Sequence, residues 1–400
     1  MVLLIAAVGV AGGLIGAAYV SVLHVVEGVI GPEQHADAAV QVLALVAVGA
    51  AIGALTKVLG DPGDVELLVD NVHVSGGSDD ARALRSLLPV SLLGIAAGSA
   101  LGPEAPLVQT GGVVGTHAGR WARLHREQVR VLTICGMASA FAVLFGAPLG
   151  SAVFALEILH RRGLEYYEAL LPALGGGFVG FAIFTMLEGV GYGPLITLPP
   201  VLSPSTGDLW FGALAAVVGA AIAVAFATLV RLARRIITPV PAPLRPALGG
   251  LVLGLLALWS FAALTFGEAQ ISAIAGAGLP ATTLAAALVA KLVASAVCLA
   301  TGWRGGFIIP LFFAGAAAGQ LLHLAFPSAD ATVLMAACMV AANVGVTKTP
   351  LGSALVVAKM AGLELLPSTT LAALGSMLLT SNVGVITTQR ARQAAAAGTA

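Results

Sequence analysis

A glutamate flanked by prolines and glycines is the residue of this sequence that is best placed to do chemistry. Residues 98–112 read Gly-Ser-Ala-Leu-Gly-Pro-Glu-Ala-Pro-Leu-Val-Gln-Thr-Gly-Gly, so Glu104 stands at the start of a short apolar helix. A helix N-terminus presents free N–H groups and about half a positive charge, which together bind anions. We therefore predict that Glu104 blocks an anion site when ionised, vacates it when protonated or swung aside, and carries a proton. Capping of its own helix is the alternative role.

A second interrupted segment, residues 302–310, lacks a carboxylate. It reads Gly-Trp-Arg-Gly-Gly-Phe-Ile-Ile-Pro and offers the backbone N–H groups of Phe307 and Ile308 at another expected helix start. Two such N-termini would form a dehydrated anion site without a full positive charge. That arrangement suits fast passage, because a buried arginine would hold an anion too tightly. A plain turn is the alternative for this segment.

The composition around both segments is that of a membrane protein. Of the 400 residues, 58% are hydrophobic and 10% are charged, whereas soluble domains carry about 25% charged residues. The mean hydropathy is +1.00. A soluble fold of this size could not bury so much apolar surface. We predict an all-α, multi-pass integral membrane protein of the plasma or inner membrane.

Apolar runs of unequal length must supply the helices that position these segments. The runs long enough to cross about 30 Å of hydrocarbon are 2–30, 39–58, 210–232 and 248–266. The runs that are shorter, or interrupted by Gly and Pro, are 88–101, 106–115, 146–159, 306–319 and 349–360. Broken helices in matching places of two halves indicate a transport site, because irregular backbone at membrane depth must be satisfied by protein or by a water-filled cavity.

The two halves of the chain repeat one another. Gly-Ala-Pro-Leu-Gly-Ser-Ala at 146–152 recurs as Lys-Thr-Pro-Leu-Gly-Ser-Ala at 348–354, and Gly-Leu-Glu and Leu-Pro follow each copy in the same order. The matched segments lie about half the chain apart, which indicates a duplication. We predict membrane repeats at 1–200 and 209–389, inverted if each crosses the membrane an odd number of times, and a short polar tail at 390–400.

Charge and motif content exclude several functions. The 19 basic and 19 acidic residues balance, which argues against a nucleic-acid partner. None of the seven histidines forms the His-Glu-x-x-His run of a metalloprotease, and we expect no enzyme activity, metal or cofactor. Arginines at 231–245 and at the C-terminus place both regions in the cytoplasm by the positive-inside rule. A transporter of organic anions is an alternative, but the path offers few side-chain donors for recognition.

Taken together, these motifs resemble those of the CLC family of chloride channels and proton-coupled anion exchangers. Gly102-Pro-Glu-Ala-Pro106 is similar to the family's Gly-basic-Glu-Gly-Pro motif, and Gly306-Phe-Ile-Ile-Pro310 to its Gly-x-Phe-x-Pro motif. Residues 145–150 are similar to the segment before its cytoplasm-facing helix. The resemblance implies a CLC-like fold of two inverted repeats with many short, broken and tilted helices. It also implies a homodimer in the lipid bilayer with one pore per subunit.

The resemblance further implies roles for named residues. Glu104 becomes the external gating glutamate, and the amides of Phe307 and Ile308 line the central anion site. The residues beside them are Gly102, Ala105 and Gly306. The implied function is transport of small inorganic anions, chloride first, with protons as a second substrate in the exchanger case.

Departures from the family pattern leave the selectivity open. Where the family's Gly-Ser-Gly-Ile-Pro motif is expected, the chain reads Gly-Asp-Pro-Gly-Asp-Val-Glu at 60–66. Pro62 replaces the anion-binding serine, as in plant members that prefer nitrate, and it is a candidate anion-binding residue together with Gly63. Nitrate- or fluoride-preferring transport is therefore the alternative to chloride. The acidic residues expected to cap their own helix are Asp61, Asp64 and Glu66.

Two further departures leave the coupling open. The family's pore tyrosine is missing, and the candidates for its place are Thr387, Thr388 and Gln389. Ile158 replaces the internal proton-transfer glutamate of the exchangers, and the adjacent Glu157 is either a substitute proton carrier or a structural residue. A channel and a proton-coupled exchanger both stay open.

Overall fold

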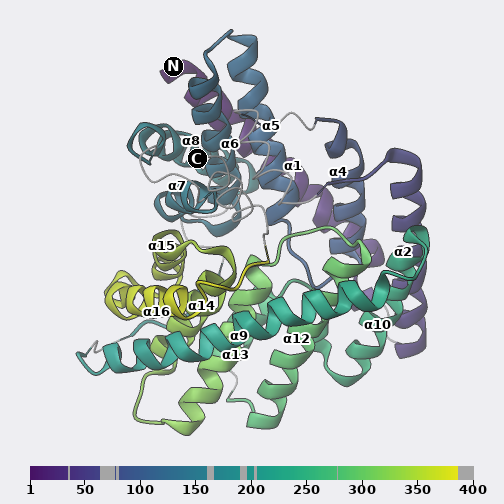
Figure 1. Cartoon of the computed structure of the whole chain (residues 1–400), viewed down its shortest axis with the longest axis vertical. Coiled ribbons are helices and arrows are strands. Elements are labelled where there is room, and N and C mark those ends of the chain that lie inside the picture. The colour runs from purple at the N-terminus through teal and green to yellow at the C-terminus, as the bar shows by residue number, and fades with distance from the viewer. Residues whose placement is uncertain are drawn as a thin grey trace, which may run out of the picture.

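The computed structural model of the chain is built from helices of very unequal length (Figure 1). It describes residues 1–34, 37–63, 77, 81–159, 166–189, 196–201, 205–276 and 278–385. Within these residues every regular element is helical, and the only β-type pairing is an isolated bridge between Gly102 and Gly306. The prediction of an all-α fold is confirmed.

Each half contributes a series of helices that differ in length and direction. The first half comprises α1 (Val2–Ile30), η1 (Pro32–Gln34), α2 (Ala38–Leu59), α4 (Ala81–Ala96), α5 (Glu104–Trp121), α6 (Arg126–Phe145), α7 (Pro148–Glu157) and α8 (Tyr166–Glu188). The second comprises α9 (Asp208–Ile237), η3 (Ala242–Leu244), α10 (Arg245–Trp259), η4 (Phe261–Ala263), α11 (Glu268–Gly276), α12 (Ala281–Thr301), α13 (Ile308–Ala325), α14 (Ala331–Thr347), α15 (Pro350–Ala361), η5 (Leu363–Leu365) and α16 (Leu366–Leu379).

Eight helices of the described chain are long and apolar enough to cross a membrane. Of the four expected spans, those at 2–30, 39–58 and 210–232 coincide with α1, α2 and α9. The fourth, 248–266, is wrong at its C-terminal end: α10 stops at Trp259, Ser260 is extended, and a short 3-10 turn follows. The spans α6, α8 and α12 were not predicted, and the run at 306–319, predicted to be short or interrupted, belongs to α13, which also qualifies by length and apolarity.

The same stop and start signals separate helices in both halves. α6 and α14 end at Gly146 and Lys348, which both adopt the left-handed conformation, with φ of 62° and 60°. Pro148 and Pro350 then open α7 and α15, because the fixed φ of proline suits a first turn and its missing N–H is not needed there. The duplicated sequence motif thus folds into a duplicated break between two helices.

Lys348 adopts a left-handed backbone conformation that favours glycine, and the hydrogen bonds of its side chain offset the cost. The buried ammonium Nζ donates to the carbonyl oxygen of Gly345 and to the carbonyl and hydroxyl oxygens of Thr380, each at 2.7 Å. These acceptors lie at the C-terminal ends of α14 and α16, where carbonyls lack intrahelical donors and a cation is favourable. Lys348 therefore joins the ends of two helices.

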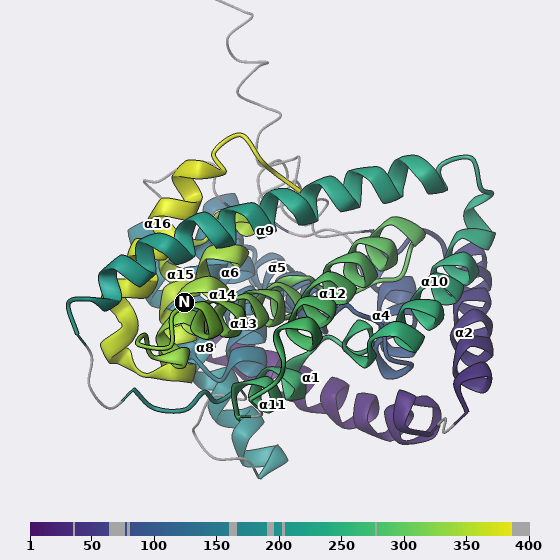
Figure 2. The ribbon, with the colours of Figure 1, turned by 90° about the horizontal axis from the view of Figure 1, so that it is seen from below.

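Helix packing repeats from one half to the other. α5 packs on α6 as α13 packs on α14, and α1 packs on α8 as α9 packs on α16. In Figure 1 the purple-to-blue first half lies beside the green-to-yellow second half, and in Figure 2 α9 runs along one side of the molecule. α2 on α10 and α7 on α15 join the halves.

Glycines allow the close approach of α7 to α15. A Cβ added at Gly150 would lie 2.8 Å from the backbone nitrogen of Val356, and one at Gly352 would lie 2.5 Å from the Cα of Phe154. The two contacts are reciprocal, because each glycine meets the residue four positions after the equivalent glycine of the other helix. Small residues that bring backbones together replace the hydrophobic drive that helices lack in lipid.

Candidate anion site

Two helix starts from opposite halves are held together by a backbone bridge. The N–H of Gly102 donates to the carbonyl of Gly306 at 2.8 Å, and the N–H of Gly306 donates to the carbonyl of Gly102 at 2.6 Å. α5 begins two residues after the first glycine, and α13 two residues after the second. The bridge therefore brings the N-termini of α5 and α13 to one point. Each of these N–H groups is satisfied by the carbonyl of the other glycine, and the anion-binding role of Gly102 and Gly306 stays a prediction.

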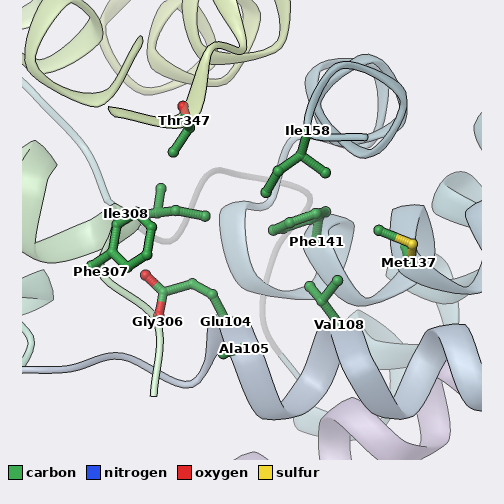
Figure 3. A pocket seen from close by; sticks show the side chains of 10 residues that line it. All are labelled: Glu104, Ala105, Val108, Met137, Phe141, Ile158, Gly306, Phe307, Ile308 and Thr347. Carbon is green, nitrogen blue, oxygen red and sulfur yellow. The ribbon is translucent and has the colours of Figure 1, made fainter. Parts of the chain in front are cut away.

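Glu104 reaches across this bridge to the other half. Its side chain is 1% exposed, and Oε1 accepts a hydrogen bond of 2.7 Å from the backbone N–H of Ile309 in the first turn of α13. Figure 3 shows the carboxylate pointing toward Phe307 and Ile308. The backbone amides of Ile308 and of Glu104 itself also lie near the carboxylate. The carboxylate thus lies on the N-terminus of the partner helix, where free N–H groups and the helix dipole favour negative charge.

The donor Ile309 was missed by the sequence reading, which named Phe307 and Ile308. The first helical residue is Ile308 and Pro310 has no N–H, so the free amides of this helix start extend to Ile309. The proline two residues into the helix was the available signal. Ala105 lines the cavity described below, within the first turn of α5.

The second carboxylate oxygen of Glu104 has no hydrogen-bond partner within the described part of the chain. Oε2 is buried, and it lies against the positions where a Cβ would stand at Gly102 or at Gly306. Both glycines are therefore needed to admit the carboxylate. A buried carboxylate oxygen without a donor is costly, and it gains a partner by taking up a proton or by leaving the site.

A small cavity adjoins Glu104. Its volume is about 20 Å³, enough for about one water or one monatomic ion. Its polar side chains are Glu104 and Thr347, and the rest of its lining is apolar or glycine. The remaining lining residues are Ala105, Val108, Met137, Phe141, Ile158, Gly306, Phe307 and Ile308 (Figure 3). An ion in this cavity would be almost free of water and would depend on backbone dipoles.

Ile158, which the sequence resemblance suggests in place of an internal glutamate, lines this cavity. The cavity wall is therefore apolar at this residue. Thr347, which the sequence reading did not name, is the side-chain hydroxyl in the cavity. It donates to the carbonyl of Asn343 at 2.9 Å and contacts the hydroxyl of Thr349 at 2.7 Å. A threonine at a helix end belongs to no recognisable motif, so only the fold reveals it.

Glu157 binds the start of a helix in the other half. Its Oε1 accepts from the N–H of Leu351 at 3.1 Å, and its Oε2 accepts from the N–H of Gly352 at 2.8 Å. Both donors are free amides in the first turn of α15. The geometry favours the structural alternative, in which this carboxylate caps α15 and fixes α7 against it.

We expect Glu157→Ala to lower the stability of the protein by about 1–2 kcal/mol, because a helix cap is lost. Glu157→Gln keeps one acceptor and should lose less. Thermal unfolding of the purified protein in detergent, followed by tryptophan fluorescence, measures both, with Glu168→Ala on the exposed start of α8 as the matched control. A Glu157→Gln protein of unchanged stability that no longer moves protons would instead identify this residue as a proton carrier.

The segment at residues 61–63 lies outside the cavity lining. Pro62 is buried, and the N–H of Gly63 donates to Oδ1 of Asp61 at 3.0 Å. The same Oδ1 pairs with Nη2 of Arg304 at 3.2 Å, so Asp61 holds its own turn and faces a cation. The anion-binding role of Pro62 and Gly63 stays a prediction. Residues that lie outside the described part of the chain are Asp64, Glu66, Thr387, Thr388 and Gln389.

Comparison with known proteins identifies the family. The family model for the voltage gated chloride channel matches residues 64–381. The chain is 29% identical over 364 residues to a chloride/fluoride channel protein of Pseudomonas syringae pv. tomato, covering 86% of this chain and 76% of that protein. It is 26% identical over 277 residues to the H(+)/Cl(-) exchange transporter ClcA of Vibrio parahaemolyticus, covering 66% of this chain and 58% of that protein, less than two thirds of its length.

A solved structure supports the same fold assignment. The crystal structure of a CLC-type fluoride/proton antiporter superposes with a TM-score of 0.83 at 22% sequence identity, covering 97% of this chain and 96% of that one. The family model matches far more than half of the residues. The chain therefore belongs to the voltage gated chloride channel family.

Proposed function

We propose that this protein moves small inorganic anions, chloride first, across a membrane through the site between α5 and α13, with Glu104 as its gate. The observation that carries the proposal is the hydrogen bond of 2.7 Å from the N–H of Ile309 to the Glu104 carboxylate, made inside a buried cavity between the two halves. A carboxylate bound at a helix N-terminus marks a place where another anion can bind.

The gate works by exchange of one anion for another. While Glu104 is ionised, its carboxylate occupies the N-terminus of α13 and excludes a substrate anion. Protonation removes the charge that holds it there, and the side chain can then swing out. A chloride-sized ion takes its place against the free amides of α13, and no cationic side chain stands among the described residues that line the cavity to slow its release.

The choice between channel and exchanger rests on how protons reach Glu104. Relatives include both a chloride/fluoride channel protein and an H(+)/Cl(-) exchange transporter. The apolar Ile158 in the cavity and the capping geometry of Glu157 favour loose or absent proton coupling. A preference for fluoride or nitrate is the alternative to chloride, while an organic anion does not fit a cavity of this size.

We further propose the arrangement of the protein in its membrane. Two inverted repeats, at 1–200 and 209–389, account for the recurring helix packing. The basic last turn of α9 supports a cytoplasmic location for the loop that follows it, and Arg390 and Arg392 support the same location for the C-terminus. The family membership supports a homodimer in the plasma or inner membrane.

Ion flux from liposomes tests the proposal. Purified protein is reconstituted, and efflux of chloride, nitrate and fluoride is recorded together with the pH inside the vesicles. We expect chloride efflux well above that of protein-free vesicles. If no inorganic anion moves down a maintained gradient, the proposal fails. If anions move without protons, the channel version stands and the exchanger version fails.

A further inference from the structure

A strongly basic cavity lies apart from the anion site, where the C-terminal ends of α2, α9 and α12 meet the start of α10. It has a volume of about 590 Å³ and shares no lining residue with the cavity beside Glu104. It lies on the side of the molecule where Figure 2 places α2, α10 and one end of α9. Its charged lining residues are Lys57, Asp61, Arg234, Arg245 and Arg304.

Four cationic side chains thus converge on this cavity from four separate segments, against one carboxylate. Part of this charge has a local cause, because Lys57 and Arg234 stand in the last turns of α2 and α9, where cations favour the helix dipole. The helix dipoles account for a cation at each helix end, but they do not explain why cations from different segments line the same cavity.

Two of the arginines are held in place before any ligand arrives. Nε and Nη2 of Arg245 donate to the carbonyls of Val240 and Thr238 at 2.8 and 2.9 Å. Nη2 of Arg304 pairs with Oδ1 of Asp61 at 3.2 Å, and the Asp61 side chain is 83% exposed. Such an exposed ion pair is weak. A more highly charged anion can therefore displace Asp61 without a large cost.

We propose that this cavity binds a phosphate group, carried either by the headgroup of a membrane phospholipid or by a soluble phosphate compound. A single halide would fill only a small part of about 590 Å³, whereas ligand sites of about 300–1,000 Å³ suit small organic molecules. Arginine forks match phosphate oxygens in pairs. The location at the ends of membrane helices puts the cations at the level of lipid headgroups.

The position of Arg304 links this cavity to the anion site. Trp303, its neighbour, is fully buried, and its Nε1 donates at 2.9 Å to the carbonyl of Pro246, which also lines the basic cavity. Gly306, two residues after Arg304, forms the bridge to Gly102. A ligand that binds Arg304 in place of Asp61 would shift the short segment 304–306, which ends at the bridge beside Glu104. This consequence for transport rests on the proposed function, whereas the binding itself does not.

The test measures binding to the full-length purified protein. Native mass spectrometry in detergent uses dioleoylphosphatidic acid as the lipid probe and inorganic pyrophosphate as the soluble probe. The lipid control is dioleoylphosphatidylcholine, whose phosphodiester is less charged and is offset by the choline cation. The variant Lys57→Gln/Arg234→Gln removes two lining cations. The matched control Arg231→Gln/Arg235→Gln removes two cations from the same end of α9 that do not line the cavity.

We expect saturable binding of at least one phosphate probe, with Kd raised at least about tenfold by Lys57→Gln/Arg234→Gln. The matched control should change Kd by less than about twofold. Binding of phosphatidic acid alone would identify a membrane lipid site, and binding of pyrophosphate would identify a soluble ligand. The proposal is overturned if neither probe binds, or if both double variants weaken binding equally, since that result would reflect diffuse surface charge. A negative result here would overturn the phosphate site alone, because the proposed anion transport is tested separately by chloride efflux from liposomes.

Discussion

Replacing Glu104 with Gln is expected to stop proton movement while anions continue to pass. Glutamine has nearly the same shape but neither charge nor a titratable proton, so it cannot hold the N-terminus of α13 as an anion does. We expect any proton movement that the unsubstituted protein shows to fall to the level of protein-free vesicles, because glutamine has no titratable proton to carry, with anion efflux kept or increased. Reconstituted vesicles with a chloride electrode and a pH probe measure both quantities.

The pH dependence follows from the same carboxylate. As the pH falls, more of the Glu104 population is protonated and releases the site, so anion efflux through the unsubstituted protein should rise. Glu104→Gln is neutral at every pH, and its efflux should be flat over the same range. Glu33→Gln, which alters an exposed carboxylate on η1, is the control and should keep the slope. A Glu104→Gln protein that folds normally and retains the pH slope would rule out this gate.

The meeting of Glu104 with residues 306–310 could be predicted from the sequence because two independent signals agreed. Breaks by Gly and Pro mark where helices start, and the duplication places the second break opposite the first. Neither signal fixes which amide faces the carboxylate. That detail depends on the residue at which the helical dihedral angles begin. The backbone bridge between Gly102 and Gly306 also gave no signal in the sequence.

The contact between Glu157 and the start of α15 could not be predicted from the sequence. Glu157 lies on α7 and its donors lie on α15, so its capping role appears only when the two helices pack. A carboxylate at the end of its own helix gives no sign of this. The end of α10 was missed for another reason: the sequence around Ser260 stays apolar, and hydropathy does not report a backbone that turns.

The contact between Gly102 and Glu104 predicts a variant that opens the gate without removing its acid. A Cβ at residue 102 would stand against Oε2 of Glu104, 2.8 Å from Cδ and 3.0 Å from Oε1. All three atoms belong to the end of the Glu104 side chain, and Gly102 has no positive φ, so alanine is tolerated if the carboxylate leaves. We expect Gly102→Ala to fold and to evict the carboxylate from the N-terminus of α13.

At neutral pH, the anion efflux of Gly102→Ala should equal the efflux that the unsubstituted protein reaches only at acidic pH. The efflux of the variant should therefore depend less on pH. The same vesicle assay as for Glu104→Gln measures it, and a single sharp peak on size exclusion shows that the fold is kept. Gly28→Ala is the matched control, because a Cβ there on α1 has nothing within 4 Å. If Gly102→Ala folds and keeps both the neutral-pH rate and the slope of the unsubstituted protein, the carboxylate does not gate the site from the position seen here. In that case the hydrogen bond between Glu104 and Ile309 would serve only to fasten α5 to α13.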